Sequence, residues 1–136
     1  MKFSKNTRNY YDYSEEFDQF QQPIVKAKIC GKEVNMLIDT GAMSCVIEDA
    51  LAKRHRLKNN KKTYITTVVD GTNKKTTGKI VKFQIGEKSF VMDMLVSVIN
   101  VGINVKIDGI LGYDFFQKYN IRIDAKRHIL YMDNVE

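Results

Sequence analysis

From Pro23 onward the sequence is a series of short apolar runs separated by turn signals, and this pattern constrains the fold more than any other feature. Apolar residues recur at every second position, which is the period of a β-strand with one buried face. Gly-containing turns separate successive runs. The pattern predicts two β-hairpins, residues 24–38 turning at 30–32 and residues 79–96 turning at 86–88, with Val81, Phe83 and Ile85 on one face of the second.

The rest of the chain adds few helices. The predicted elements are a helix at 48–56, a polar hairpin around Asp70-Gly71, a short helix at 113–119, and strands at 121–124 and 129–132. Many short strands with one or two short helices are typical of an all-β barrel or sandwich. A parallel α/β fold is disfavoured because too few helices separate the strands. The length of 136 residues is that of one domain.

Residues 1–22 differ from the rest of the sequence. Six aromatic side chains are spread among polar ones, with neither strand alternation nor helical spacing. We interpret this segment as an arm that is flexible alone and that docks through its aromatics. The boundary lies near Pro23, so the folded domain is predicted at 23–136.

The net charge of +6 comes from one run, since residues 53–62 hold six Lys or Arg and no acid, while the remainder holds 16 of each sign. We interpret the run as a solvated helix end and loop, with an acidic partner as the alternative. Nucleic-acid binding is disfavoured, because basic side chains are not spread along a face with aromatics among them.

Cys30, Cys45 and the two histidines form no closely spaced ligand pair, so no metal site is predicted. We also find no apolar run with the length of a signal peptide core or a membrane span. The sequence therefore predicts a protein of the cytoplasm or another intracellular compartment, with reduced thiols and without membrane contact.

The clearest candidate for a catalytic site is the stretch Met36-Leu37-Ile38-Asp39-Thr40-Gly41-Ala42. An apolar strand ends in a carboxylate, which is followed by a hydroxyl and by a glycine that permits close backbone approach. We expect the Asp39 carboxylate to be partly desolvated at this strand end. The three residues Asp-Thr-Gly could occur by chance, so the surrounding sequence determines whether they indicate a catalytic site.

With this context the sequence resembles the retropepsin-like aspartic proteases, the family of retroviral and retrotransposon proteases and their cellular and bacterial relatives. The resemblance covers about residues 23–132. A late stretch, Ile110-Leu111-Gly112-Tyr113-Asp114-Phe115-Phe116, matches a second motif of the family. Two motifs in the right order are more specific than either alone.

The resemblance implies a retropepsin-like barrel and a role for each matched residue. Asp39 is the catalytic acid, supported by Thr40, Gly41 and Ala42. Ile110, Leu111 and Gly112 back the catalytic loop. The mobile hairpin called the flap has its tip at Val69, Asp70, Gly71, Thr72 and Asn73. No cofactor is implied. Ile47, Val68, Val69 and Ile107 are candidates for substrate-pocket walls, although each is equally consistent with plain core.

Peptide hydrolysis by this chemistry needs two carboxyl groups that share a proton. The chain holds one Asp-Thr-Gly, so the resemblance implies a C2 homodimer with Asp39 from each copy at the axis. The predicted function is that of an aspartic endopeptidase. The alternative is an inactive dimerisation or peptide-binding module of the same fold. Residues 1–22 are either a self-cleaved pro-segment or interface strand, or an extension without a catalytic role.

Overall fold

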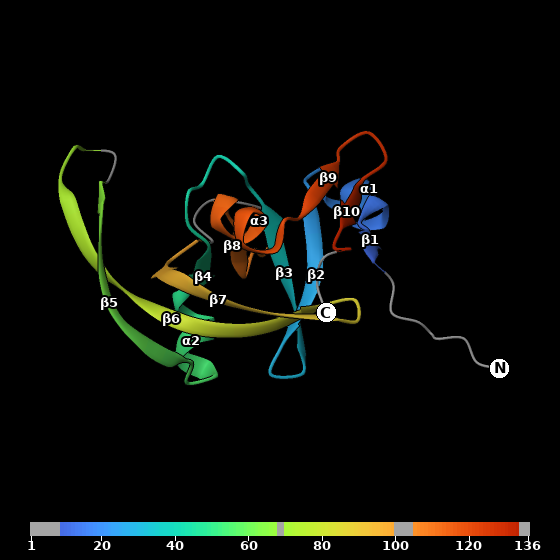
Figure 1. Ribbon diagram of the computed structural model, residues 1–136. Coiled ribbons are helices and arrows are strands. Elements are labelled where there is room, and N and C mark those ends of the chain that lie inside the picture. Colours follow the sequence, from blue (N-terminus) through green and yellow to red (C-terminus); the bar gives the residue numbers. More distant parts are fainter. Residues whose placement is uncertain (1–8, 68–69, 100–104, 134–136) are drawn as a thin grey trace.

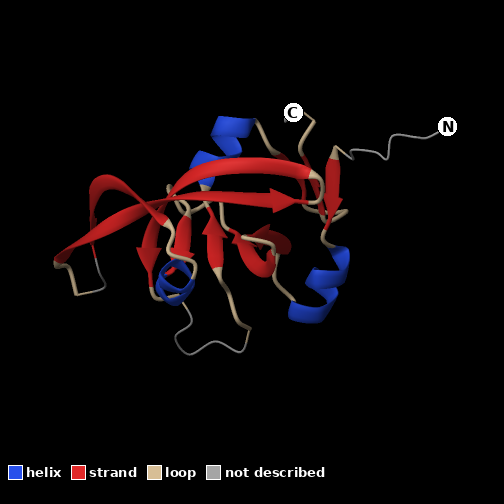
Figure 2. Cartoon of the chain, turned by 90° about the horizontal axis from the view of Figure 1, so that it is seen from below, coloured by secondary structure: helices blue, strands red, loops and turns tan. Residues whose placement is uncertain are grey.

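The computed structural model describes residues 9–67, 70–99 and 105–133. Strands make up most of this part, and the helices lie around their periphery (Figures 1 and 2). The elements are β1 Tyr10–Asp12, α1 Ser14–Phe20, β2 Ile24–Ile29, β3 Lys32–Ile38, β4 Val46–Glu48, α2 Asp49–Arg54, β5 Lys58–Thr67, β6 Asn73–Ile85, β7 Lys88–Ser97, β8 Gly109–Leu111, α3 Tyr113–Tyr119, β9 Arg122–Asp124 and β10 Ile129–Tyr131. The predicted helices and strands from residue 24 onward are confirmed, with shifts of a few residues at their ends.

The main sheet closes into a barrel. Its strand order is β2-β3-β8-β4-β7-β6-β5, and β2 also pairs with β6 through Ala27 and Ile85. This extra pairing joins β2, β3, β8, β4, β7 and β6 into a ring and leaves β5 outside it, paired to β6. The predicted all-β barrel is therefore confirmed.

Turn chemistry fixes the two predicted hairpins. Cys30 and Gly31 both have positive φ, 53° and 76°, at the connection from β2 to β3. Positive φ at both central residues gives the turn whose twist matches a two-stranded ribbon. Gly86, with φ 59°, begins the connection from β6 to β7, where Ile85 pairs with Lys88.

Packed aromatic rings form the centre of the core. Phe83 of β6 and Phe90 of β7 are 2% and 1% exposed, and their ring centroids lie 5.3 Å apart. Phe115 of α3 meets Phe90 edge to face at 5.0 Å, a preferred aromatic geometry. Because Phe115 is fully buried, α3 is anchored to the β6–β7 hairpin.

The described part of this segment, residues 9–22, contains a strand and a helix, although its sequence shows neither strand alternation nor helical spacing. β1 pairs antiparallel with β10, which pairs with β9, and α1 follows directly (Figure 1). Tyr13, between β1 and α1, is 2% exposed and belongs to the core. The seven residues of α1 show no helical spacing of apolar side chains in the sequence.

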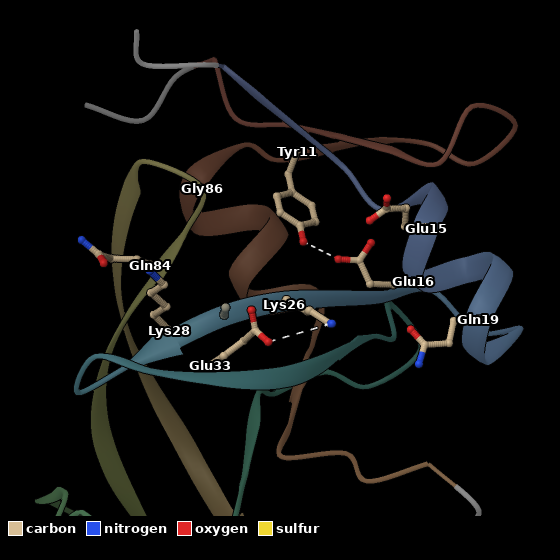
Figure 3. A pocket seen from close by; sticks show the side chains of 10 residues that line it. Tyr11, Glu15, Glu16, Gln19, Lys26, Lys28, Glu33, Gln84 and Gly86 are labelled. Atoms are coloured by element: carbon tan, nitrogen blue, oxygen red, sulfur yellow. Dashed lines mark hydrogen bonds and ion pairs between the residues drawn. The ribbon is translucent and has the colours of Figure 1, made fainter. Parts of the chain in front are cut away.

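A polar cavity of about 450 Å³ lies where this segment meets β2 and β3 (Figure 3). In it the Tyr11 hydroxyl donates a hydrogen bond to the Glu16 carboxylate. Burial, and then this bond to a carboxylate, raise the pKa of Tyr11 well above its ordinary value. Three acids and two lysines line the cavity, and the Nζ of Lys26 lies 3.9 Å from Glu33. The buried Tyr13 ring attaches the segment to the core, and the hydrogen bond from Tyr11 to Glu16 links β1 to α1.

The basic run 53–62 occupies the end of α2 and the first half of β5, so the predicted loop is wrong for residues 58–62. Lys53 pairs with Asp49 at 3.1 Å, and Lys62 pairs with Asp93 at 2.8 Å. The bond from Lys62 lowers the pKa of Asp93. Within the described ranges, no helix is long and apolar enough to cross a membrane.

Candidate active site

Residues 39–45 form the loop between β3 and β4, and Asp39 is its first residue. The Asp39 N–H donates to the Leu111 carbonyl at 3.1 Å, and the Asp39 carbonyl accepts the Ala42 N–H at 3.1 Å. The Gly41 N–H donates to Asp39 Oδ1 at 3.0 Å. A Cβ at Gly41 would lie 3.2 Å from the same oxygen. The backbone of the loop therefore orients the Asp39 side chain.

Asp39, Thr40 and Gly41 are exposed in the single chain. The expectation that the Asp39 carboxylate is partly desolvated is therefore wrong for the single chain. Val34, Met36 and Ile38 of β3 are buried, with Ile38 8% exposed, but the loop turns outward directly after them. The exposed face of the loop is open to a second molecule.

The segment predicted to back the loop lies against it. β8 pairs parallel with β3, where Ile38 faces Leu111, and antiparallel with β4, where Val46 faces Ile110. A Cβ at Gly112 would lie 2.6 Å from the Ser44 carbonyl oxygen, closer than real Cβ contacts allow. Glycine is therefore required at 112 for the two backbones to pass so closely.

Asp114 also holds the loop, a role that was not predicted from the sequence. Its carboxylate accepts the Cys45 N–H, at 3.1 Å to Oδ1 and 3.2 Å to Oδ2, and the Phe115 N–H at 2.8 Å. The one available signal was an Asp in the first turn of a predicted helix, a position where carboxylates satisfy free backbone N–H groups. Its partner Cys45 lies 69 residues away, so no local pattern indicated the contact.

Cys45 is fully buried, as expected of a small hydrophobic residue. Its Sγ accepts the Gly112 N–H at 3.4 Å and lies 3.1 Å from Asp114 Oδ1. Burial raises the pKa of the Cys45 thiol well above its ordinary range. The thiol is therefore protonated and unreactive at neutral pH.

The β5–β6 hairpin extends beyond the barrel (Figure 1). Its turn lies where the sequence predicted it, with Gly71 at φ 86°. Asp70 Oδ1 accepts the Thr72 N–H at 2.9 Å and the Thr72 hydroxyl at 2.7 Å, and these bonds lower the pKa of Asp70. Asn73 begins β6, whereas Val69 lies outside the described residues.

A groove of about 910 Å³ runs beneath this hairpin. Its walls include Val46, Leu95, Val96, Val98, Ile99 and Ile110. Ile110 precedes Leu111, the residue whose carbonyl binds Asp39, so the groove adjoins the loop. The Thr76 hydroxyl of β6 donates to the Val96 carbonyl of the neighbouring strand β7 at 2.8 Å, which fixes the two strands together at the edge of the groove.

The predicted pocket walls differ from the observed ones. Ile47 and Ile107 are 0% and 1% exposed and do not line the groove, so the core interpretation is correct for both. Val68 lies outside the described residues, as does Val69. Among the residues that the structure describes, no group of three His, Cys, Asp or Glu is placed to hold a metal ion.

A family model described as aspartyl protease matches residues 25–115. The chain belongs to the aspartyl protease family. The match spans Asp39, the hairpin and Asp114, so the elements that build the loop of this aspartyl protease family member all lie within it. No curated protein matches the chain.

Solved structures share the fold of this family member. The retroviral protease-like domain of Ddi1 from Leishmania major is 18% identical, with a TM-score of 0.60, over 84% of this chain and 91% of that one. The simian foamy virus (mac) protease is 16% identical, with a TM-score of 0.52, over 69% of this chain and 91% of that one. The resemblance to retropepsin-like aspartic proteases is therefore confirmed at the level of fold.

Proposed function

We propose that the protein is an aspartic endopeptidase whose active site forms from Asp39 of two chains. One observation carries the proposal. An exposed carboxylate stands at the end of β3, oriented by the Gly41 N–H at 3.0 Å and tied to Leu111 at 3.1 Å. A loop built to present one carboxylate to the outside is suited to pairing with an identical loop.

The chemistry follows from two carboxyl groups that share one proton. The ionised Asp39 removes a proton from water, which attacks the carbonyl carbon of the scissile peptide bond. The protonated Asp39 of the second copy donates a hydrogen bond, and then its proton, to the carbonyl oxygen, which gives a tetrahedral diol. The first Asp39 then passes the proton it took from water to the amide nitrogen, and the C–N bond breaks to release the amine. The second Asp39 takes a proton back from a diol hydroxyl as the carboxylic acid product forms, so the pair again shares one proton. The cycle needs two carboxyls and water, so no cofactor enters it.

The sequence holds a single Asp-Thr-Gly, so the second carboxyl comes from a C2 homodimer. Thr40 is exposed beside Asp39, which supports a role for its hydroxyl at the contact between the two copies. We assign Thr40 a hydrogen bond to that loop.

The substrate is an extended polypeptide that lies between the Asp39 loops and the β5–β6 hairpins. The groove of about 910 Å³ beneath the hairpin gives room for side chains of such a strand. Main-chain bonds supply affinity and the apolar walls supply preference. In this proposal the hairpin, with Asp70 and Gly71 at its turn, acts as the flap.

The test is cleavage of a peptide library at several protein concentrations. We expect the rate to rise more steeply than linearly at low concentration, because dimers form from monomers. The Asp39→Asn variant should be inactive, while Asp18→Asn, a matched change at an exposed acid of α1, should cleave normally. Undiminished cleavage by Asp39→Asn would refute the proposal. A wild-type dimer that cleaves no peptide would favour the alternative of a binding module.

The N-terminal segment does not fit the role of a substrate of its own folded chain. β1 is paired with β10 and Tyr13 is 2% exposed, whereas a protease needs an extended and accessible strand. We therefore expect purified wild-type protein to remain uncut between Tyr10 and Ile24. A new N-terminus in this range by mass spectrometry, absent from Asp39→Ala, would establish self-processing instead.

A further inference from the structure

Four consecutive residues of β6, Lys74 to Thr77, line the groove. Side chains alternate along a strand, so Lys75 and Thr77 lie on one face of β6, and Lys74 and Thr76 lie on the other. The Thr76 hydroxyl is held by the Val96 carbonyl at 2.8 Å. Lys75 and Thr77 are both exposed, so their side chains are accessible from the groove.

The cross-strand partners agree with this assignment. Thr77 pairs with Thr63 of β5, and both line the groove. Lys75 pairs with Ile65, and Lys75 lines the groove as well. Ile65 is 67% exposed, an unusual degree for an isoleucine in a strand. Lys75 and Ile65 therefore lie side by side on one face of the hairpin, a cation next to an exposed apolar side chain.

The charges along the groove do not balance. Lys74 and Lys75 line it, and Asp49 is the only acid among its described lining residues. The Asp49 carboxylate is held by Lys53 at 3.1 Å. In the described part of the chain, Lys75 makes no ion pair. The groove therefore combines apolar walls with an ammonium group on its hairpin side.

We propose that Lys75 makes the enzyme prefer peptides with an acidic side chain close to the scissile bond, beside a hydrophobic side chain that fills the groove. This inference rests on the proposed function, because it takes the groove as the substrate site. A carboxylate of the substrate would pair with the Lys75 ammonium. The apolar walls of the groove would cover the backbone of the substrate. Because both copies contribute a Lys75, acidic side chains on either side of the cut are favoured.

The test compares peptides that differ only by Glu or Gln at one position near the cut. We expect wild-type kcat/KM to be about five-fold higher for the best Glu position, the effect of one partly exposed ion pair. Added salt should reduce the ratio. Lys75→Gln should abolish the preference, and Lys75→Glu should shift it to Lys-containing peptides. Lys58→Gln removes the same charge from β5 outside the groove lining and should keep the wild-type ratio.

A Glu preference that survives in Lys75→Gln, or a wild-type enzyme indifferent to Glu at every position, would overturn the inference while leaving the protease function intact. If no peptide is cut, a binding measurement tests the role of Lys75 separately from the protease function. Binding of fluorescent Glu and Gln peptides to the Asp39→Asn variant should show the same difference in affinity, sensitive to Lys75→Gln. Equal affinities would overturn the role of Lys75 independently of turnover.

Discussion

Replacing Asp114 by alanine removes the side chain that fastens the end of the Asp39 loop to α3. The carboxylate accepts the Cys45 N–H at 3.1 and 3.2 Å, lies 3.1 Å from Cys45 Sγ, and accepts the Phe115 N–H at 2.8 Å. Cys45 is fully buried and Asp114 is half-buried, so water replaces the lost acceptor only in part. We expect the variant to be destabilised and the loop to lose its fixed position.

The magnitude follows from the groups left without partners. A buried N–H without an acceptor costs about 1–3 kcal/mol, and this applies to Cys45. The Phe115 N–H loses less, because it also donates to the Gly112 carbonyl at 3.1 Å. The total is about 2–3 kcal/mol, a large share of a domain stability of about 5–15 kcal/mol. Asp114→Asn keeps one carbonyl oxygen and should lose about half as much.

Urea unfolding followed by circular dichroism measures this loss. With a slope of about 1–3 kcal/mol/M, the midpoint of Asp114→Ala should fall by about 1–2 M. Asp18→Ala is the matched control, since Asp18 is exposed and uses only its backbone carbonyl in a hydrogen bond. Its free energy of unfolding should stay within about 0.5 kcal/mol of wild type. A midpoint for Asp114→Ala equal to that of the control would refute the reasoning.

Three further perturbations test the loop and the core. Gly112→Ala places a Cβ 2.6 Å from a loop carbonyl, so unfolding free energy should fall by about 1–3 kcal/mol; an unchanged urea midpoint would contradict the close packing. Iodoacetamide should alkylate exposed Cys30 in the folded protein and reach buried Cys45, whose pKa is raised, only in urea; mass spectrometry distinguishes the two, and equal rates would be inconsistent with this burial. Tyr13→Ala should cost about 3–5 kcal/mol and Tyr10→Ala, at a 42% exposed position, much less; similar losses would exclude the N-terminal segment from the core.

Local patterns predicted the features that depend on neighbours in sequence. The two hairpins were predictable because strand alternation and a glycine at each turn act over a few residues. Gly31 has φ 76° and Gly86 has φ 59°, as such turns require. The position of Asp39 at the end of an apolar strand was predictable for the same reason.

Contacts between distant residues were not predictable from such patterns. Asp114 meets Cys45 across 69 residues, and the buried state of Ile47 and Ile107 depends on how the barrel closes. The exposure of Asp39 depends on the direction of a seven-residue loop, which no periodicity encodes. β1 and α1 show no strand or helical period, and the contact that anchors them, the burial of Tyr13 in the core, depends on distant residues.

The three-residue strand β8 has a consequence for folding. It pairs with β3 on one side and β4 on the other, although about 70 residues separate it from β3 along the chain. Such contacts raise the contact order, and high contact order slows folding. During synthesis, residues 36–48 would leave the ribosome long before the strand that completes them. The Asp39 loop is therefore a late product of folding, and a nascent chain that ends before Leu111 lacks a positioned carboxylate.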